Sequence, residues 1–119
     1  MKLLPLAAVI AGLALPLAAH AQRAIELHVR SAGELAELCA ANPREPGGDA
    51  RINYCHGFAQ GVVDVELMHG KPFCFPHPAP GRTATLHQFV EWMRTSPDRG
   101  SMNPVDGLMR FLTERYPCR

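Results

Sequence analysis

The feature that most constrains the fold of this chain is its set of four cysteines. They are Cys39, Cys55, Cys74 and Cys118, in a sequence of 119 residues. An even number of cysteines in a short exported chain is typical of a disulfide framework. The alternative is a zinc site, in which Cys55-His56 and Cys74 with His77 would supply two sulfurs and two nitrogens. Because adjacent side chains on a helix point about 100° apart and rarely chelate one ion, we predict two disulfides and no metal.

The N-terminal segment has the pattern of a secretory signal. Lys2 precedes an apolar run from Leu3 to Ala19, and Ala19-His20-Ala21 has the small-x-small pattern that signal peptidase recognises. A retained N-terminal anchor is the alternative, but the run is short for a membrane span and contains two prolines. We therefore predict a cleavable signal peptide at residues 1–21, a mature periplasmic domain at residues 22–119, and no membrane attachment after cleavage.

The charge balance argues against a nucleic-acid partner. The chain has 12 Lys and Arg residues and 11 Asp and Glu residues. Lys2 is the only charged residue of the predicted signal peptide, so its removal makes the numbers of basic and acidic residues equal. A nucleic-acid-binding protein would show a basic excess or a basic stripe, so we expect no nucleic-acid binding.

Capping residues and prolines divide the rest of the chain into four helical segments. Ser31 with Glu34, and Thr85 with Gln88, have the spacing of a capping box. Asn103-Pro104 is a strong helix start, because Asn caps well and Pro suits the first helical position. No run shows the alternation of a strand. The sequence therefore predicts an all-α domain of four helices, cross-linked by two disulfides, with helices at about residues 32–42, 52–69, 85–96 and 104–116.

Helix geometry chooses among the three pairings that four cysteines allow. Cys39 falls in the last turn of the first helix and Cys55 in the first turn of the second, and helices joined by a short loop usually pack antiparallel. Cys74 precedes the third helix and Cys118 follows the fourth, so a hairpin of these two helices would bring them together. We therefore predict the pairs Cys39–Cys55 and Cys74–Cys118.

The second predicted helix contains two glycines one turn apart. Gly57 and Gly61 each cost about 1 kcal/mol relative to alanine in a helix interior, so we expect a compensating role. Glycines at this spacing make a flat strip that another backbone can approach closely. We predict that Gly57 and Gly61 mark close helix packing inside the domain, and that Asp64 is buried beside them and bonded to another helix.

The sequence contains no convergent set of catalytic residues. A nucleophile needs a free cysteine, or a serine in a constrained turn with a base nearby, but the cysteines are expected to be paired and Gly-x-Ser-x-Gly is absent. Asp64 and Glu66 are two residues apart and do not share a helical face. We therefore predict a binding protein with no enzymatic activity and no cofactor.

Several short motifs follow one another in a characteristic order. They are Cys55-x-Gly57-Phe58-x-x-Gly61-x-x-Asp64, Cys74-Phe75-Pro76, Gln88, Ser96-Pro97 and Tyr116-Pro117-Cys118. This order resembles the Rap/Tai family of bacterial immunity proteins over roughly residues 31 to 118. Two residues of the last helix, Gly107 and Arg110, depart from the small apolar residues that the family tends to have there.

The resemblance implies an all-helical, disulfide-bonded periplasmic protein. Members of this family bind a peptidoglycan amidase effector of type VI secretion and block its active-site cleft, often as homodimers. The alternative function is that of a small periplasmic stress or chaperone-type binding protein with no toxin partner, whose histidines would sense mild acid. An amidase gene next to this one would favour the immunity function.

A proline-rich loop is the predicted partner-binding element. Four prolines between residues 71 and 81 exclude a regular helix and stiffen the chain, and Cys74 would tether it. The loop carries Phe73, Phe75 and His77, and aromatic anchors are common in binding hot spots. Alternatively, the two phenylalanines fill the core. The polar loop at residues 44–51 is a second candidate for partner binding.

Overall fold

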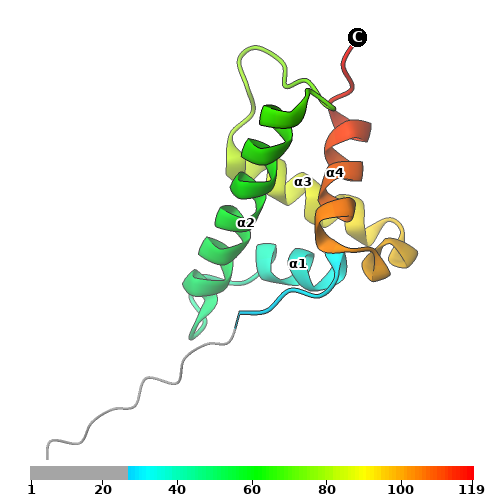
Figure 1. The fold of residues 1–119 in the computed structure, drawn as a ribbon. Coiled ribbons are helices and arrows are strands. Elements are labelled where there is room, and N and C mark those ends of the chain that lie inside the picture. Colours follow the sequence, from blue (N-terminus) through cyan, green and yellow to red (C-terminus); the bar gives the residue numbers. More distant parts are fainter. Residues whose placement is uncertain (1–26) are drawn as a thin grey trace, which may run out of the picture.

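The computed structural model describes residues 27–119, which form a helical domain (Figure 1). Its elements are α1 (Ala32–Cys39), α2 (Gly48–His69), α3 (Arg82–Arg94), the 3₁₀ helix η1 (Pro97–Ser101) and α4 (Pro104–Arg115). These described residues contain four α-helices and no strand, which confirms the predicted fold class. The predicted signal peptide, residues 1–21, lies outside the described residues.

None of the helices in the described part of the chain combines the length and the apolar character needed to cross a membrane.

Two of the three predicted N-terminal caps are confirmed. The side chain of Ser31 accepts a hydrogen bond from the Glu34 N–H at 3.2 Å, and the side chain of Asn103 accepts one from the Val105 N–H at 2.9 Å. The expected cap at Thr85 is wrong, because α3 begins at Arg82 and Thr85 is buried inside it. Its hydroxyl donates to the Gly81 carbonyl four residues earlier, a bond that Thr makes inside helices.

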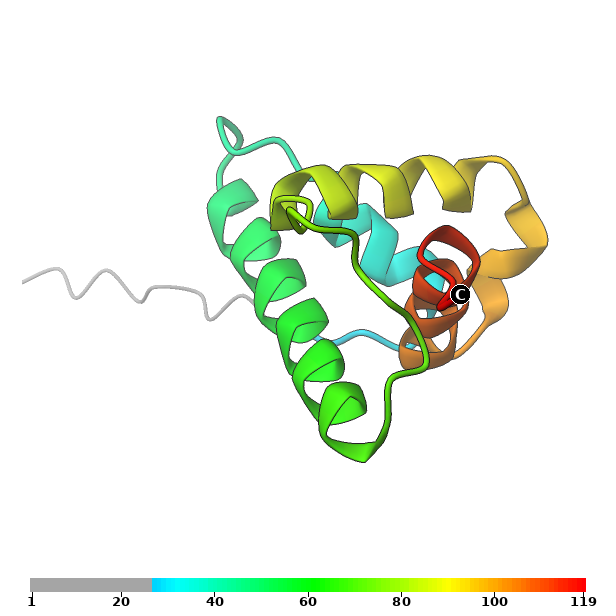
Figure 2. The same ribbon diagram turned by 90° about the horizontal axis from the view of Figure 1, so that it is seen from above.

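The short helix α1 is the centre of the core. Four of its eight residues are buried, and it packs against α2, α3 and α4. Figure 2 shows α1 inside the triangle that these three helices outline. The largest fully buried side chains of the core are Leu35 of α1 and, from the rest of the domain, Phe73, Phe89, Phe111, Leu108 and Leu112.

Both predicted disulfides are present. The Cys39–Cys55 bridge joins the end of α1 to the first half of α2, with Cα atoms 5.2 Å apart, and both cysteines are buried. The Cys74–Cys118 bridge, with Cα atoms 4.9 Å apart, is exposed at both cysteines. The hairpin that predicted this second pair is not formed, because α3 crosses α4, which is seen nearly end-on in Figure 2. Instead, the loop after α2 runs beside the end of α4, where the Cys74 N–H donates to the Tyr116 carbonyl at 2.7 Å.

The prediction that Gly57 and Gly61 pack closely inside the domain is wrong. A Cβ atom at either position would meet nothing within 4 Å. Each glycine follows a buried residue, Cys55 or Ala59, by two positions, which is about 200° around the helix. The two glycines therefore lie on the outer face of α2.

Asp64 is exposed on α2 and is not buried. Its carboxylate accepts a hydrogen bond from Gln60 Nε2 of the same helix at 2.7 Å. The expected bond to another helix is therefore wrong.

A close contact between two helices is found at Gly107 in α4. A Cβ atom there would lie 2.5 Å from the Ala32 Cβ of α1, a distance that carbon atoms do not tolerate. Gly107 is one of the two departures from the family pattern noted above. Its lack of a side chain lets α4 approach the central helix.

Alanine substitutions distinguish these glycines. Gly57→Ala and Gly61→Ala should each raise the free energy of unfolding by up to about 1 kcal/mol, because alanine is the better helix former and has open space. Gly107→Ala should lower it by about 1–3 kcal/mol, because α1 and α4 must separate. Urea unfolding of residues 22–119, with the disulfides intact, measures all three. A stability loss in Gly61→Ala that depends on protein concentration would reveal a close contact between copies instead.

The two disulfides should be reduced in sequence. Thiol–disulfide exchange requires access of the attacking thiolate to a sulfur, so the exposed Cys74–Cys118 bridge should open before the buried Cys39–Cys55 bridge. Timed alkylation followed by peptide mass spectrometry would record the order. Simultaneous opening, or opening of Cys39–Cys55 first, would contradict the burial that the structure assigns to the two bridges.

Candidate functional site

The proline-rich loop is anchored by its aromatic residues. Phe73 is only 1% exposed, so the expectation that it is presented to a partner is wrong, and the alternative, that it fills the core, is confirmed. Its ring packs edge-to-face against Phe75, and Phe75 packs against Tyr116 with ring centroids 5.0 Å apart. Residues 73 and 75 share one side of an extended segment, which leaves Cys74 on the other side, facing solvent.

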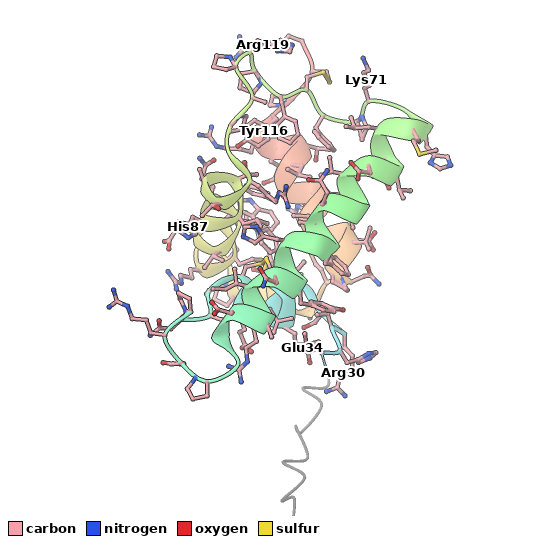
Figure 3. The ribbon with its side chains drawn as sticks, turned by 90° about the vertical axis from the view of Figure 1, so that its left-hand side faces the viewer. Arg30, Glu34, Lys71, His87, Tyr116 and Arg119 are labelled. Carbon is pink, nitrogen blue, oxygen red and sulfur yellow. A yellow bond between two sulfur atoms is a disulfide. The ribbon has the colours of Figure 1, made fainter. Side chains whose placement is uncertain are left out.

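The rest of the loop remains at the surface. Phe75 is half-buried, and His77, which precedes a cis peptide bond to Pro78, is exposed. Figure 3 shows Lys71, at the start of the loop, at the same end of the molecule as Tyr116 and Arg119. The loop therefore covers the end of α4 and presents His77 and part of Phe75. Their role in partner binding stays a prediction.

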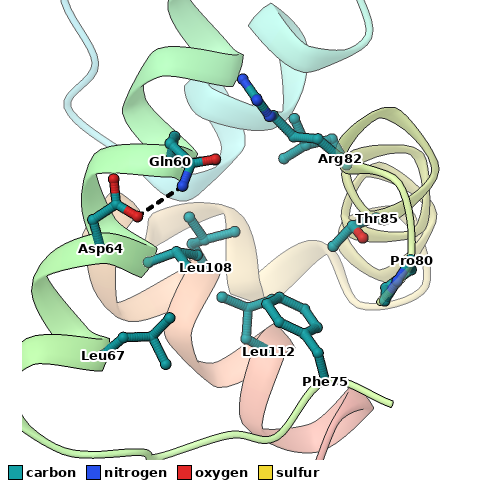
Figure 4. Close-up of a pocket in the computed structure, with 12 residues that line it drawn as sticks. Gln60, Asp64, Leu67, Phe75, Pro80, Arg82, Thr85, Leu108 and Leu112 are labelled. Carbon is teal, nitrogen blue, oxygen red and sulfur yellow. Dashed lines mark hydrogen bonds between the residues drawn. The ribbon is translucent and has the colours of Figure 1, made fainter. Parts of the chain in front are cut away.

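A groove lies between the loop and three helices (Figure 4). We call it the α2–α3 groove. It has a volume of about 280 Å³. Its apolar walls come from α2, α3, α4 and the loop, and its polar groups sit on α2 and α3. The residues that define it are Gln60, Val63, Asp64, Leu67, Phe75, Pro80, Arg82, Thr85, Leu86, Leu108 and Leu112, together with Ala59.

The groove exists because α1 crosses α2 only near its start (Figure 1), where the Cys39–Cys55 bridge joins them. At about 1.5 Å per residue, the 22 residues of α2 span about 33 Å. The C-terminal half of α2 thus extends beyond the central helix and is covered only in part. Three large apolar side chains remain exposed there: Val65 at 52%, Leu67 at 42% and Met68 at 82%.

The sequence carries only a partial signal of this groove. Ala59, Val63 and Leu67 repeat at four-residue spacing and form an apolar stripe on α2. No motif singles out Arg82. The stripe does not indicate at which residue of α2 the neighbouring elements stop covering it.

A second hollow, of about 640 Å³, lies between the end of α1, the first half of α2 and α3. His56, His87, Glu91 and Arg94 contribute to its wall. Within residues 27–119, no three His, Cys, Asp or Glu side chains are placed to hold a metal ion. The zinc set considered above is not assembled, because Cys55 and Cys74 belong to different disulfides.

One cluster of polar side chains ties α3 to α4. The hydrogen bond from Arg110 holds the pKa of Glu114 below its ordinary value, and a bond from Trp92 adds to the effect. Arg110 Nε and Trp92 Nε1 donate to this carboxylate at 2.9 and 2.8 Å. The guanidinium of Arg99 lies 3.9 Å from the centre of the Trp92 ring. These contacts fix the crossing of two helices, and none of the four residues lines the α2–α3 groove.

Comparison with known proteins gives a single finding. The family model of the Rap1a immunity proteins matches residues 31–118, which is most of the chain. Neither the curated proteins nor the solved structures contain a match. The matched range begins at the cap of α1 and ends at the second disulfide, so it includes both bridges, the loop and the groove. The chain belongs to the Rap1a immunity protein family.

Proposed function

We propose that this protein is an exported immunity protein that binds a peptidoglycan amidase effector of type VI secretion and occludes its active-site cleft. Membership of the immunity family carries the general part of this proposal. The amidase target follows from the resemblance in the sequence motifs. The location rests on the predicted signal peptide, and the two disulfides support it, because such bridges persist in oxidising compartments such as the periplasm.

The anchored loop is the observation that best supports occlusion. A blocking element has to enter a cleft without losing much conformational freedom. Here the backbone bond from Cys74 to Tyr116, the bridge to Cys118 and the buried Phe73 ring hold the loop in place before any partner arrives. His77 projects from this fixed segment at the surface.

A binding role also fits the chemistry of the described residues. All four cysteines are in disulfides, so none is available as a nucleophile. The groove is lined mainly by apolar side chains, with Asp64 and Arg82 as its charged residues. The homodimer implied by the resemblance stays a prediction, which sedimentation of residues 22–119 would measure.

Inhibition of an amidase tests the proposal directly. If an amidase effector is encoded beside this gene, residues 22–119 should bind it and abolish its cleavage of peptidoglycan peptides at a stoichiometric ratio. Export of the protein should protect cells that carry the amidase in their periplasm, whereas the same chain without residues 1–21 should not. Absence of binding to any such amidase would reject the proposal and favour the stress or chaperone-type alternative.

Two loop variants separate binding from stability. His77→Ala should weaken amidase binding by more than about 1 kcal/mol, as expected of an interface anchor, with little change in Tm because the side chain is exposed. Phe73→Ala should lower the free energy of unfolding by about 3–5 kcal/mol, because it removes a buried ring. Calorimetric titration and thermal unfolding measure the two effects. Full affinity in His77→Ala would remove this part of the loop from the interface.

A further inference from the structure

We propose that the α2–α3 groove is a receptor for one large apolar side chain of the effector, flanked by a basic group that pairs with Asp64 and an acidic group that pairs with Arg82. This inference rests on the proposed function and assigns part of its interface. In the proposed function, the loop of this protein inserts into the effector. The groove would in addition bind a side chain of the effector.

The size and the lining of the groove favour a side chain as the occupant. Its volume of about 280 Å³ lies just below the range of about 300–1,000 Å³ that is usual for small-molecule pockets. Leu108 and Leu112 are each 1% exposed, and Leu86 is 3% exposed, so the deep wall consists of side chains fixed in the core. The groove therefore has its shape before a partner binds.

The mouth of the groove leaves apolar surface in water. Leu67 is 42% exposed on the α2 side, and Phe75 is half-buried on the loop side. Covering such surface stabilises a complex by roughly 25 cal/mol per Å² of apolar area. An apolar side chain that enters between Leu67 and Phe75 would remove both from water.

Two opposite charges stand on different sides of the groove. Figure 4 shows Asp64 on α2, bonded to Gln60, and Arg82 at the start of α3. Neither of them takes part in the ion pairs formed among residues 27–119. A partner segment with a basic group on one flank and an acidic group on the other would complement both, and such complementarity fixes register and speeds encounter.

Continuity with the blocking loop favours the effector over a second copy of this chain. Phe75 and Pro80 belong to the loop and also form one wall of the groove. A partner that accommodates the loop must therefore approach the mouth of the groove as well. Loop and groove together form one surface.

Neighbouring residues of α2 provide a matched test with the amidase. Leu67→Ala should weaken binding about fivefold or more, whereas Met68→Ala, which removes a more exposed apolar side chain outside the groove, should leave the affinity unchanged. Asp64→Lys and Arg82→Glu should each slow association, and Glu37→Lys, an exposed position on α1 outside the groove, serves as the charge control. If wild type binds the amidase and these groove variants bind it equally well, the groove inference is wrong and the proposed function stands.

A peptide probe tests the groove without the amidase. The blocked tripeptide Lys-Phe-Glu should shift the backbone NMR signals of Gln60, Asp64 and Arg82, and the matched peptide Lys-Ser-Glu should not. No shift at these positions would reject the receptor. Shifts at the groove, together with no amidase binding, would support the receptor and reject the proposed function. Self-association that Leu67→Ala abolishes and Met68→Ala preserves would identify a second copy as the occupant and overturn the proposal.

Discussion

The burial of Phe73 beside the Cys74–Cys118 bridge is the constraint on which the working surface of this protein depends. The ring enters the core with 1% exposure, and the next residue is cross-linked to the chain end. The backbone bond from Cys74 to Tyr116 closes the same junction. The proline-rich segment is thereby held against the end of α4. This junction fixes both the exposed part of the loop and one wall of the groove.

The features that the sequence predicted well are those decided within one or two helical turns. Ser31 and Asn103 cap their helices because the cap and the bonded N–H are two or three residues apart. Thr85 misled the same reasoning, since a Thr followed by Gln three residues later also occurs inside a helix, where it bonds the preceding turn. The Cys74–Cys118 pair was predicted correctly, but from a helix hairpin that does not form. Its true cause is the path of the loop, which no local signal reveals.

The glycines show why spacing alone is a weak guide to packing. Gly57 and Gly61 have the spacing of a close helix contact, yet they face away from the core. Both glycines lie on the side of the helix away from Cys55. The sequence would have placed them on the outer face only if Cys55 were already known to face the core. Gly107 has no glycine partner one turn away, yet it makes a close contact between two helices, because α1 crosses α4 there. Likewise, the groove depends on where α1 crosses α2, and the apolar stripe on α2 continues beyond the part of the helix that α1 covers.

The central claim is that the loop and the groove form one preformed surface for an amidase effector. Hydrogen exchange of residues 22–119, followed by mass spectrometry with and without the amidase, tests it most directly. The account predicts slower exchange in peptides from residues 60–82 in the complex, and unchanged exchange in peptides from residues 40–50 before and at the start of α2. Slower exchange confined to residues 40–50, with residues 60–82 unaffected, would contradict the account.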